Sequence, residues 1–351
     1  MSPAVPTAST SPVTGGVLAV HAHPDDETLS TGALLATWAA AGLPATVVTC
    51  TRGERGEVIG GALAHLEGDG PGLAARRERE VAAAAAALGV TQLFLDTLRL
   101  PPAECAGEVP PGAPERTSAA RSGDAGARYE DSGMSWVASG QAGAAAEVPA
   151  RALVGVPLDE AAGRLAGLIR DRRPDLVVTY EPGGGYGHPD HVRAHAITVR
   201  AVRLAAPAWT PAVAWAVAPA AALRAGYAAL AVDPDARAVL DAHRDDRRAT
   251  REAPLAVPDP DGPLPSVAVD GPVDLVVDVR PVRDRVLAAL RAHATQVQAV
   301  RALEHPDAAG CYALSNLVLA PVLPQETYRL APGSAPLPRA GLPPGARLAA
   351  A

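Results

Sequence analysis

The stretch Val17–Glu27 (VLAVHAHPDDE) decides the fold, because it joins an apolar segment directly to a cluster of titratable side chains. Its first five residues, Val17–His21, are a short and mostly aliphatic run, as expected of a buried strand in a parallel sheet. A polar turn follows this strand, and a helix is then expected over Ser30–Ala41, ended by Gly42.

The same order of strand and helix recurs further along the chain. Strands are expected at 45–50, 92–95 and 175–179, and helices at 75–88, 158–172 and 191–204. Strands that alternate with helices at this spacing favour βαβ units. The sequence therefore predicts an α/β fold: a Rossmann-like, mainly parallel sheet with helices on both faces, plus a smaller C-terminal α+β part. In such folds, ligands bind at the carboxyl ends of the strands.

The domain organisation follows from where this pattern weakens. Residues 17–225 are expected to form the catalytic α/β domain, and 226–331 a C-terminal part packed on it. Residues 101–128, rich in Pro, Gly, Ser and Ala, are expected to be a flexible insertion. We expect a disordered leader over 1–16 and a disordered tail over 332–351. Beyond residue 225, the clearest signals are strand-like pieces at 267–269 and 275–279 and a helix over 282–298.

Composition excludes several classes of function. The 351 residues carry a formal net charge of −7, and the chain contains no Lys. Because phosphate binding needs a concentrated positive face, no nucleic-acid partner is expected. Cys50, Cys105 and Cys311 are far apart and form no CxxC pair, so neither a disulfide framework nor a thiolate metal site is expected.

Two segments bear on the location of the protein. Residues 1–16 lack the basic and apolar regions of a secretory signal. Residues 204–223 are uncharged over a length that could span a bilayer, but they are mostly Ala and are interrupted by prolines. We therefore expect a cytoplasmic protein with no membrane partner. The oligomeric state is unknown from the sequence.

The first cluster, His21–Glu27, crowds two imidazoles and three carboxylates into seven residues. So many ionisable groups beside a buried strand are costly unless a cation neutralises part of their charge. The alternative is that Asp25 or Asp26 only caps the following helix and that the histidines are incidental. His21 is expected to pack beside the site rather than to bind a metal.

The second cluster, Tyr186–His191 (YGHPDH), follows the glycine-rich loop Glu181–Gly185. His188 and His191 are three residues apart at the start of a helix, so both can serve one site. The alternative is that Asp190 caps this helix and that both histidines lie at the surface.

Together the two clusters indicate a catalytic metal centre. Two histidines with one carboxylate and an open position for water form the ligand pattern of catalytic zinc, and ferrous iron suits the same donors. The metal would acidify the bound water near neutral pH, and a spare carboxylate could serve as the general base.

HAHPDDE at residues 21–27, followed by GYGHPDH at 185–191, resembles the PIG-L/LmbE family of zinc-dependent N-deacetylases. The likeness is closer to the actinobacterial members that deacetylate N-acetylglucosaminyl-inositol in mycothiol biosynthesis. Supporting stretches are 47–60, the helix with Arg77 and Glu80, 131–134, 293–296 and 313–316. The resemblance extends from residue 17 to about residue 330 and so covers most of the chain.

The resemblance implies one metal ion per chain, Zn²⁺ or Fe²⁺, held by His23, Asp26 and His191. It implies that the substrate is a small amino sugar from which an N-acetyl group is removed. The substrate residues implied by the family pattern are Glu57, Arg77, Asp131 and Ser132. His293 could reach the site, although a packing role is an equally good interpretation.

The catalytic roles implied by the resemblance fall on four residues. Asp25 would be the general base that deprotonates the water. His188 would stabilise the tetrahedral intermediate and protonate the leaving amine, and Asp190 would orient His188. Tyr186 would polarise the amide oxygen.

Other functions fit the same chemistry. The chain could instead be an amidase that cleaves mycothiol S-conjugates, or a tailoring deacetylase for an antibiotic or glycolipid amino sugar. A non-catalytic binding protein on this scaffold would lack the base or a ligand, and none is missing here. Residues 101–128 are longer than the family pattern leads us to expect, and they precede Asp131. The insertion therefore bears on the identity of the substrate more than on the chemistry.

Overall fold

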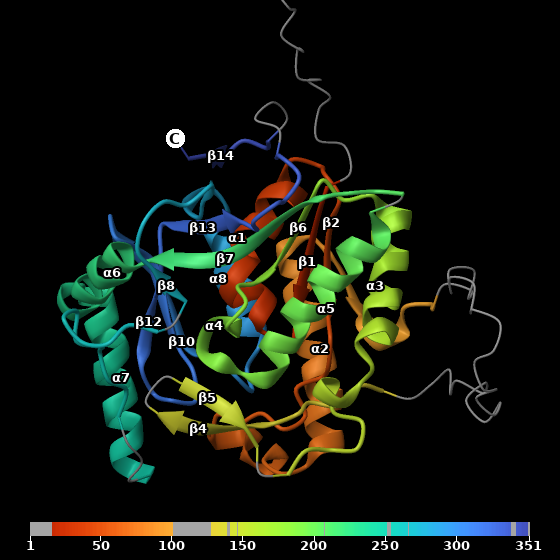
Figure 1. The fold of residues 1–351 in the computed structure, drawn as a ribbon. Helices are drawn as coiled ribbons and strands as arrows, with labels where there is room; N and C mark the ends of the chain where they lie inside the picture. The colour runs from red at the N-terminus through yellow and green to blue at the C-terminus, as the bar shows by residue number, and fades with distance from the viewer. Residues whose placement is uncertain are drawn as a thin grey trace, which may run out of the picture.

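A mixed β-sheet runs through the centre of the molecule (Figure 1). The structure, a computed structural model, describes residues 16–100, 128–138, 141–145, 147–206, 208–250, 254–265, 267–337 and 342–349. The expected leader, apart from residue 16, and the expected insertion, apart from residue 128, lie outside the described residues.

Five parallel strands form the first half of this sheet. Their spatial order is β3 (Thr91–Phe94), β2 (Ala45–Thr49), β1 (Val17–His21), β6 (Leu176–Tyr180) and β7 (Ala212–Pro219). The register pairs His21 with Thr49, so the carboxyl ends of β1 and β2 lie side by side. The expected Rossmann-like parallel sheet is confirmed.

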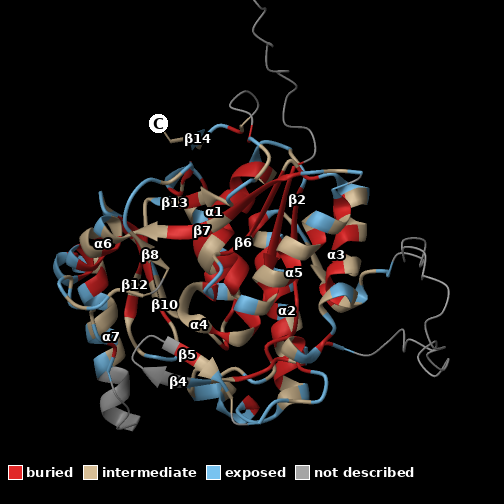
Figure 2. Ribbon diagram, in the orientation of Figure 1, coloured by how far each residue is buried: buried red, intermediate tan, exposed pale blue. Residues whose placement is uncertain are grey.

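Helices cover both faces of the parallel strands because successive side chains of a strand point to opposite faces. Val17 and Ala19 of β1 pack in one core with α1 (Asp26–Ala40), α2 (Gly70–Leu88) and α8 (Arg283–Ala292). Leu18 and Val20 pack in a second core with α3 (Leu158–Arg172) and α5 (Pro189–Ala205). The central strands β1, β2 and β6 are buried along their whole length, whereas β3 at the edge is not (Figure 2).

The C-terminal part continues the same sheet. Strand β13 (Gln325–Leu330) pairs antiparallel with β7, β9 (Leu275–Asp278) pairs with β13, and β14 (Ala346–Leu348) pairs with β9. The boundary expected near residue 225 therefore does not separate two sheets. Strand β14 also lies within the segment 332–351 that was expected to be disordered. Its pairing depends on backbone hydrogen bonds, which the Pro-, Gly- and Ala-rich sequence there does not reveal.

A smaller antiparallel sheet stands beside the main one, as expected for the C-terminal part. It consists of β10 (Gln298–His305), β11 (Ala308–Ala313) and β12 (Leu319–Val322). The helix expected over 282–298 is shorter in the structure, because α8 ends at Ala292 and β10 begins at Gln298. The C-terminal part is thus richer in strands than its sequence indicates.

The remaining elements connect these layers. They are the hairpin β4 (Met134–Ala138) and β5 (Gln141–Ala144), the short α4 (Gly184–Gly187), α6 (Ala220–Val232), α7 (Pro234–Thr250), β8 (Ala268–Val269), and the 3₁₀ turns η1 (Gly61–Leu66), η2 (Leu95–Thr97), η3 (Leu153–Gly155) and η4 (Arg280–Val282). Within the described ranges, every helix is too short or too polar to cross a membrane. Cys50 and Cys311 are free thiols, while Cys105 lies outside the described residues.

The entry into β1 sets a steric test of the fold. A Cβ added to Gly16, which has φ +77°, would lie 2.0 Å from the carbonyl oxygen of Pro44, the acceptor of the Val17 amide. Gly42 has a similar φ of +72° but nothing within 4 Å of an added Cβ. We expect Gly42→Ala to lower the free energy of unfolding by about 1–2 kcal/mol, the cost of the left-handed backbone. Gly16→Ala should cost about 1–3 kcal/mol more, because it also overpacks the turn.

Denaturant unfolding of the two variants checks this expectation. Equal losses of stability would show that the turn before β1 relaxes around the added methyl group and does not constrain the strand.

Candidate active site

A cavity of about 380 Å³ opens at the carboxyl ends of the parallel strands. Eight of the expected site residues line it: His23, Asp25, Asp26, Glu57, Arg77, Asp131, Tyr186 and His188. Leu314, Ser315 and Asn316, which follow β11, complete the wall with Gln296. The cavity lies where the α/β fold places its ligands, and it is built by both parts of the chain.

Asp26 lies between the two histidines expected to share a metal with it. Its Oδ2 atom is 3.4 Å from Nδ1 of His23 and 3.4 Å from Nε2 of His191. The three residues reach this point from different elements: His23 follows β1, Asp26 begins α1, and His191 lies in the first turn of α5. All three are buried, with 7%, 7% and 3% of their surface exposed.

In His23 and His191, the outer ring nitrogen, which does not face Asp26, faces another oxygen. Nε2 of His23 is 3.2 Å from Oδ2 of Asp190, and Nδ1 of His191 is 3.1 Å from the carbonyl oxygen of Gly184. A neutral imidazole that donates from its outer nitrogen presents the other nitrogen as an acceptor. Metal-binding histidines are held in this way, with the outer N–H on a carboxylate or a backbone carbonyl.

The chemistry of these donors suits a divalent cation. Nε2 of His191 is buried and makes no hydrogen bond within the described part of the chain, although it lies 3.4 Å from Asp26. Burial raises the pKa of Asp26, but His191 and His23 outweigh it and hold this pKa well below its usual range. Burial lowers the pKa of His23, but the Asp131, Asp190 and Asp26 carboxylates hold it well above its ordinary value. Carboxylates facing nitrogens at this depth need a positive charge, which a metal ion or a proton can provide.

Two groupings in the described structure meet a geometric requirement for a metal, and the expected set of His23, Asp26 and His191 is not one of them. The first is His23, His188 and His191, and the second is His23, Asp131 and Asp190, each with ligand atoms within 4.8 Å of one another. Both share His23 with the expected set. The first grouping also contains His191, so it shares two residues with the expected set.

Asp25 has an unusual backbone for a non-glycine residue. Its φ is 108°, a conformation that costs about 1–3 kcal/mol and persists only where its surroundings enforce it. Although it precedes α1 directly, its side chain makes no capping hydrogen bond. Oδ2 instead lies 3.6 Å from Nη2 of Arg77 at the cavity wall. Burial raises the pKa of Asp25 to about 6, with Arg77 opposing the shift and Asp26 adding to it. The capping alternative for Asp25 is not what the structure has.

His188 and Tyr186, on the α4–α5 segment, also line the cavity. Nδ1 of His188 accepts the backbone N–H of Asp190 at 3.1 Å. Nε2 must therefore carry the proton of a neutral His188 and can donate it toward a ligand. Burial, together with His23 and His191, lowers the pKa of His188 to about 2, so the neutral form prevails. The Tyr186 ring centroid lies 6.0 Å from that of His188.

Asp190 and Ser132 differ from their expected roles. The Asp190 carboxylate contacts His23, and only its backbone amide contacts His188. Ser132 is 1% exposed and donates both its hydroxyl and its backbone N–H to Asp190, so its side chain does not face the cavity. The spacing HPDH makes Asp190 and His188 neighbours in sequence, which is why His23, 167 positions away, was not foreseen as its partner.

The other expected substrate residues lie on the cavity wall and differ in exposure and in hydrogen bonding. Glu57 is exposed, and its backbone carbonyl accepts a hydrogen bond from Gln296 at 2.9 Å. Asp131 is buried and accepts the amides of Gly133 and Arg55 at 2.8 and 3.2 Å. Arg77 is 3% exposed, and it donates to the carbonyl oxygens of Gly53 and Pro24 besides facing Asp25.

Sequence reasoning missed the supporting role of Tyr180. Its ring stacks on His191 with a centroid distance of 4.2 Å, and its hydroxyl accepts the Ala22 amide at 2.9 Å. It thus fixes both the loop after β1 and the start of α5. Its position as the last residue of β6 was the signal available. His21 packs beside the site as expected, with Nε2 2.9 Å from the Thr31 hydroxyl.

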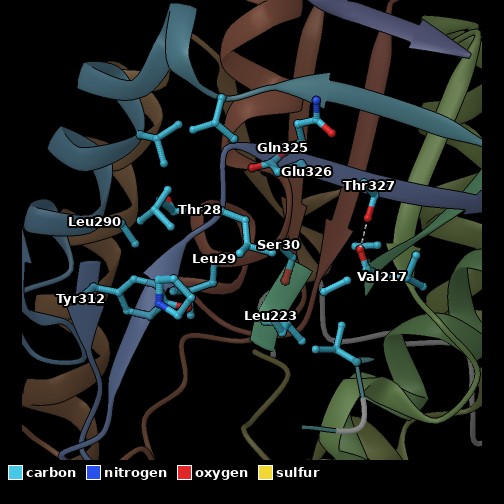
Figure 3. Close-up of a pocket in the computed structure, with 18 residues that line it drawn as sticks. Thr28, Leu29, Ser30, Val217, Leu223, Leu290, Tyr312, Gln325, Glu326 and Thr327 are labelled. Atoms are coloured by element: carbon cyan, nitrogen blue, oxygen red, sulfur yellow. Dashed lines mark hydrogen bonds between the residues drawn. The ribbon is translucent and has the colours of Figure 1, made fainter. Parts of the chain in front are cut away.

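A second, smaller cavity of about 170 Å³ is also lined by the first part of α1 (Figure 3). Thr28, Leu29 and Ser30 line it, and Leu29 also lines the first cavity. Most of its wall is apolar, with Leu223, Leu290 and Tyr312 among the lining side chains, while Thr327 donates to the Val217 carbonyl at 2.6 Å. The expected site residues do not line this cavity.

A parallel α/β sheet that carries two histidines, a shared carboxylate and a spare carboxylate at its carboxyl edge defines a class: the metal-dependent hydrolases. The chain belongs to the PIG-L family, because the family model described as GlcNAc-PI de-N-acetylase matches residues 18–202. The expected family membership is confirmed. The matched segment includes both histidine clusters and ends within α5.

Several curated relatives share most of the chain. A protein of Kineococcus radiotolerans is 43% identical over 324 residues, which are 91% of this chain and 78% of the relative. A protein of Rhodococcus erythropolis is 39% identical over 329 residues, 91% of each chain. A protein of Streptomyces avermitilis is 37% identical over 336 residues, 92% of this chain and 94% of the relative. All three are named 1D-myo-inositol 2-acetamido-2-deoxy-alpha-D-glucopyranoside deacetylase.

Among solved structures, a teicoplanin-biosynthesis deacetylase in complex with teicoplanin is 17% identical, with a TM-score of 0.43 over 91% of this chain and 99% of that one. The N,N'-diacetylchitobiose deacetylase of Pyrococcus horikoshii is 20% identical, with a TM-score of 0.37 over 57% of this chain and 60% of that one.

Proposed function

We propose that this chain hydrolyses the acetamide of 1D-myo-inositol 2-acetamido-2-deoxy-α-D-glucopyranoside, the deacetylation step of mycothiol biosynthesis. The relatives named for this reaction are 36–43% identical over 91–92% of the chain, which supports the substrate. The observation that carries the chemistry is the placement of Asp26 3.4 Å from one nitrogen of each of two histidines.

In this proposal, His23, Asp26 and His191 hold one Zn²⁺ ion. The ion, when bound, acidifies a water molecule and polarises the amide carbonyl. The protein holds two of these donors in place beforehand: Asp190 contacts Nε2 of His23, and the Gly184 carbonyl contacts Nδ1 of His191. Tyr180 supports His191 by stacking on its ring. Ferrous iron suits the same donors, and its use depends on availability.

The proton steps fall to Asp25. Its carboxylate lies on the cavity wall and accepts a proton from the attacking water, whose oxygen then bonds to the acetamide carbon. When the carbon–nitrogen bond breaks, the leaving nitrogen takes a proton and departs as the free amine, and the acetyl group leaves as acetate. Arg77, 3.6 Å from Oδ2 of Asp25, stabilises the ionised carboxylate between turnovers.

His188 stabilises the charge that develops on the amide oxygen. The Asp190 backbone N–H occupies its Nδ1, which leaves the Nε2–H to donate into the cavity. Tyr186, from the same segment, is proposed to polarise the same oxygen. Because His188 is neutral, it acts here as a hydrogen-bond donor. The leaving amine is proposed to take its proton from Asp25, which has accepted one from the water, and not from His188 as the resemblance implies.

The sugar and inositol hydroxyls are proposed to meet the polar wall of the cavity. Asp131 and Arg77 lie at its inner end near His23 and Asp25, while Glu57 is exposed toward solvent. Burial alone would raise the pKa of Asp131, but the nearby His23 and the Gly133 backbone amide hold it well below its usual range. Asp131 is therefore an ionised acceptor for hydroxyl donors.

Removing the shared carboxylate tests the metal site. Asp26→Asn should lower the affinity for Zn²⁺ by more than about 100-fold, because even residues that only orient metal ligands contribute about 10- to 100-fold. Equilibrium dialysis with metal analysis of the purified protein measures this. The exposed Asp241 provides a matched control, and Asp241→Asn should bind Zn²⁺ like the parent protein. Undiminished binding by Asp26→Asn would exclude Asp26 as a ligand.

Replacing the neighbouring carboxylate should separate chemistry from metal binding. Asp25→Asn should keep its metal and lose about 10²–10⁴-fold in kcat, the range for a positioned proton acceptor. The adjacent Asp26→Asn variant is the contrast, because it should lose the metal itself. Near-normal turnover of metal-loaded Asp25→Asn would rule out the base assignment.

Substrate choice is tested by comparing the inositol conjugate with free N-acetylglucosamine. The conjugate should have a kcat/KM at least about tenfold higher, because its added hydroxyls pair with polar groups that the free sugar leaves unpaired. Glu57→Gln should lower kcat/KM for the conjugate by about three- to tenfold through a weakened hydrogen bond. Glu147→Gln, at an exposed position outside the cavity wall, is the control.

Two outcomes would overturn the substrate assignment. Equal efficiency on both sugars would favour a tailoring deacetylase of another amino sugar. A preference for a mycothiol S-conjugate would favour the amidase, with the metal chemistry intact.

A further inference from the structure

The backbone of Asp25 must be held in place from outside its own residue. Its φ of 108° and ψ of −37° are found mainly in glycine, so the polypeptide relaxes from this conformation unless contacts oppose the change. Relaxation would rotate the Asp25 side chain relative to Asp26, since the two residues are adjacent. The contacts on the Asp25 amide therefore decide where its carboxylate points.

Glu27 is the residue that contacts this amide. Its Oε2 accepts the backbone N–H of Asp25 at 3.0 Å. Its Oε1 accepts the Thr28 hydroxyl at 2.6 Å and lies 2.7 Å from Nε2 of His293. Glu27 and His293 are both 0% exposed, so water does not compete for these hydrogen bonds.

His293 reaches Glu27 from the far end of the chain. It follows α8, 266 positions after Glu27, and lies beyond the segment 18–202 that the PIG-L family model matches. Two amides, those of Gln296 and Val297, donate to its backbone carbonyl and fix the turn from which its ring projects. Its Nδ1 has no hydrogen-bond partner in the described ranges, so the polar contacts of the ring are made through Nε2.

We infer that Glu27 and His293 are positioning residues for Asp25: the buried His293–Glu27 pair fixes the Asp25 amide and thereby directs its carboxylate into the cavity. Neither side chain lines the cavity, so both act through Asp25 without touching the substrate. This inference rests on the proposed role of Asp25 as the base. It assigns a function in the reaction to a residue of the C-terminal part, which the paired histidine motifs do not include.

The first test compares kcat with KM. His293→Ala removes the donor to Glu27, and the metal-loaded variant should lose about 10- to 100-fold in kcat, as expected for an oriented catalytic group that has lost its support. KM should stay within about twofold of the parent value, and metal content should not change. His293→Gln, whose side-chain amide can donate to Glu27, should recover most of the lost rate. His305→Ala, the same substitution in β10 of the C-terminal part, should behave like the parent.

The second test asks whether His293 acts through Asp25. In the Asp25→Asn background, His293→Ala should cause no further loss of kcat, because the group that it positions is already inactive. An equal loss in both backgrounds would overturn the inference and leave His293 a residue of the general packing. A rise in KM alone, or a loss of metal in proportion to activity, would overturn it as well.

A failure of the proposed base is distinguishable from a failure of this inference. Near-normal turnover of Asp25→Asn alone would refute the base, whatever His293 does. If His293→Ala does not fold, as judged by thermal unfolding, Glu27→Gln provides the same comparison. The glutamine side chain of this variant has only one oxygen, which cannot accept from both the Asp25 amide and His293. The kcat should therefore fall again, with KM and metal content unchanged. Unchanged kcat in folded Glu27→Gln would contradict the inference.

Discussion

The constraint on which the rest of the structure depends is the burial of Asp26 between His23 and His191. A carboxylate and two imidazoles at this depth are unfavourable unless each polar atom has a partner and the net charge is balanced. The parallel pairing of β1 with β2 and β6 brings the chain ends that carry these groups to one edge. The start of α1 at Asp26 and of α5 at Pro189 then fixes their orientation. The fold brings these three groups together, which supports the proposal that a cation lies between them.

The C-terminal part extends the central sheet and contributes residues to the cavity. Its strand β13 extends the sheet beyond β7, and its helix α8 packs on α1 and α2, the helices that carry Asp26 and Arg77. Residues 314–316 and Gln296 line the same cavity as the motif residues. A catalytic domain ending near residue 225 would therefore lack part of the cavity wall and the partner of Glu27.

Much of this arrangement could be predicted from the sequence, for physical reasons. Apolar runs of strand length, each followed by a polar turn and an amphipathic helix, identify a parallel α/β sheet, and this held for β1, β2, β3 and β6. Because the clusters at 21–27 and 186–191 follow β1 and β6, the location of the cavity was also accessible. The partners of individual side chains could not be predicted. The pairing of Asp190 with His23 and of Glu27 with His293 joins residues 167 and 266 positions apart, and one sequence carries no signal for such contacts. The side chains of β14 likewise show no pattern from which its backbone pairing with β9 could be predicted.

The central claim is that a single metal ion sits between His23, Asp26 and His191. Anomalous diffraction at the zinc absorption edge, on crystals of the zinc-loaded protein, measures its position directly. The account predicts one strong peak bonded to Nδ1 of His23, Asp26 and Nε2 of His191, with Nε2 of His23 still on Asp190. A peak on the other side of the His23 ring, bonded to Asp131 and Asp190 instead, would contradict it.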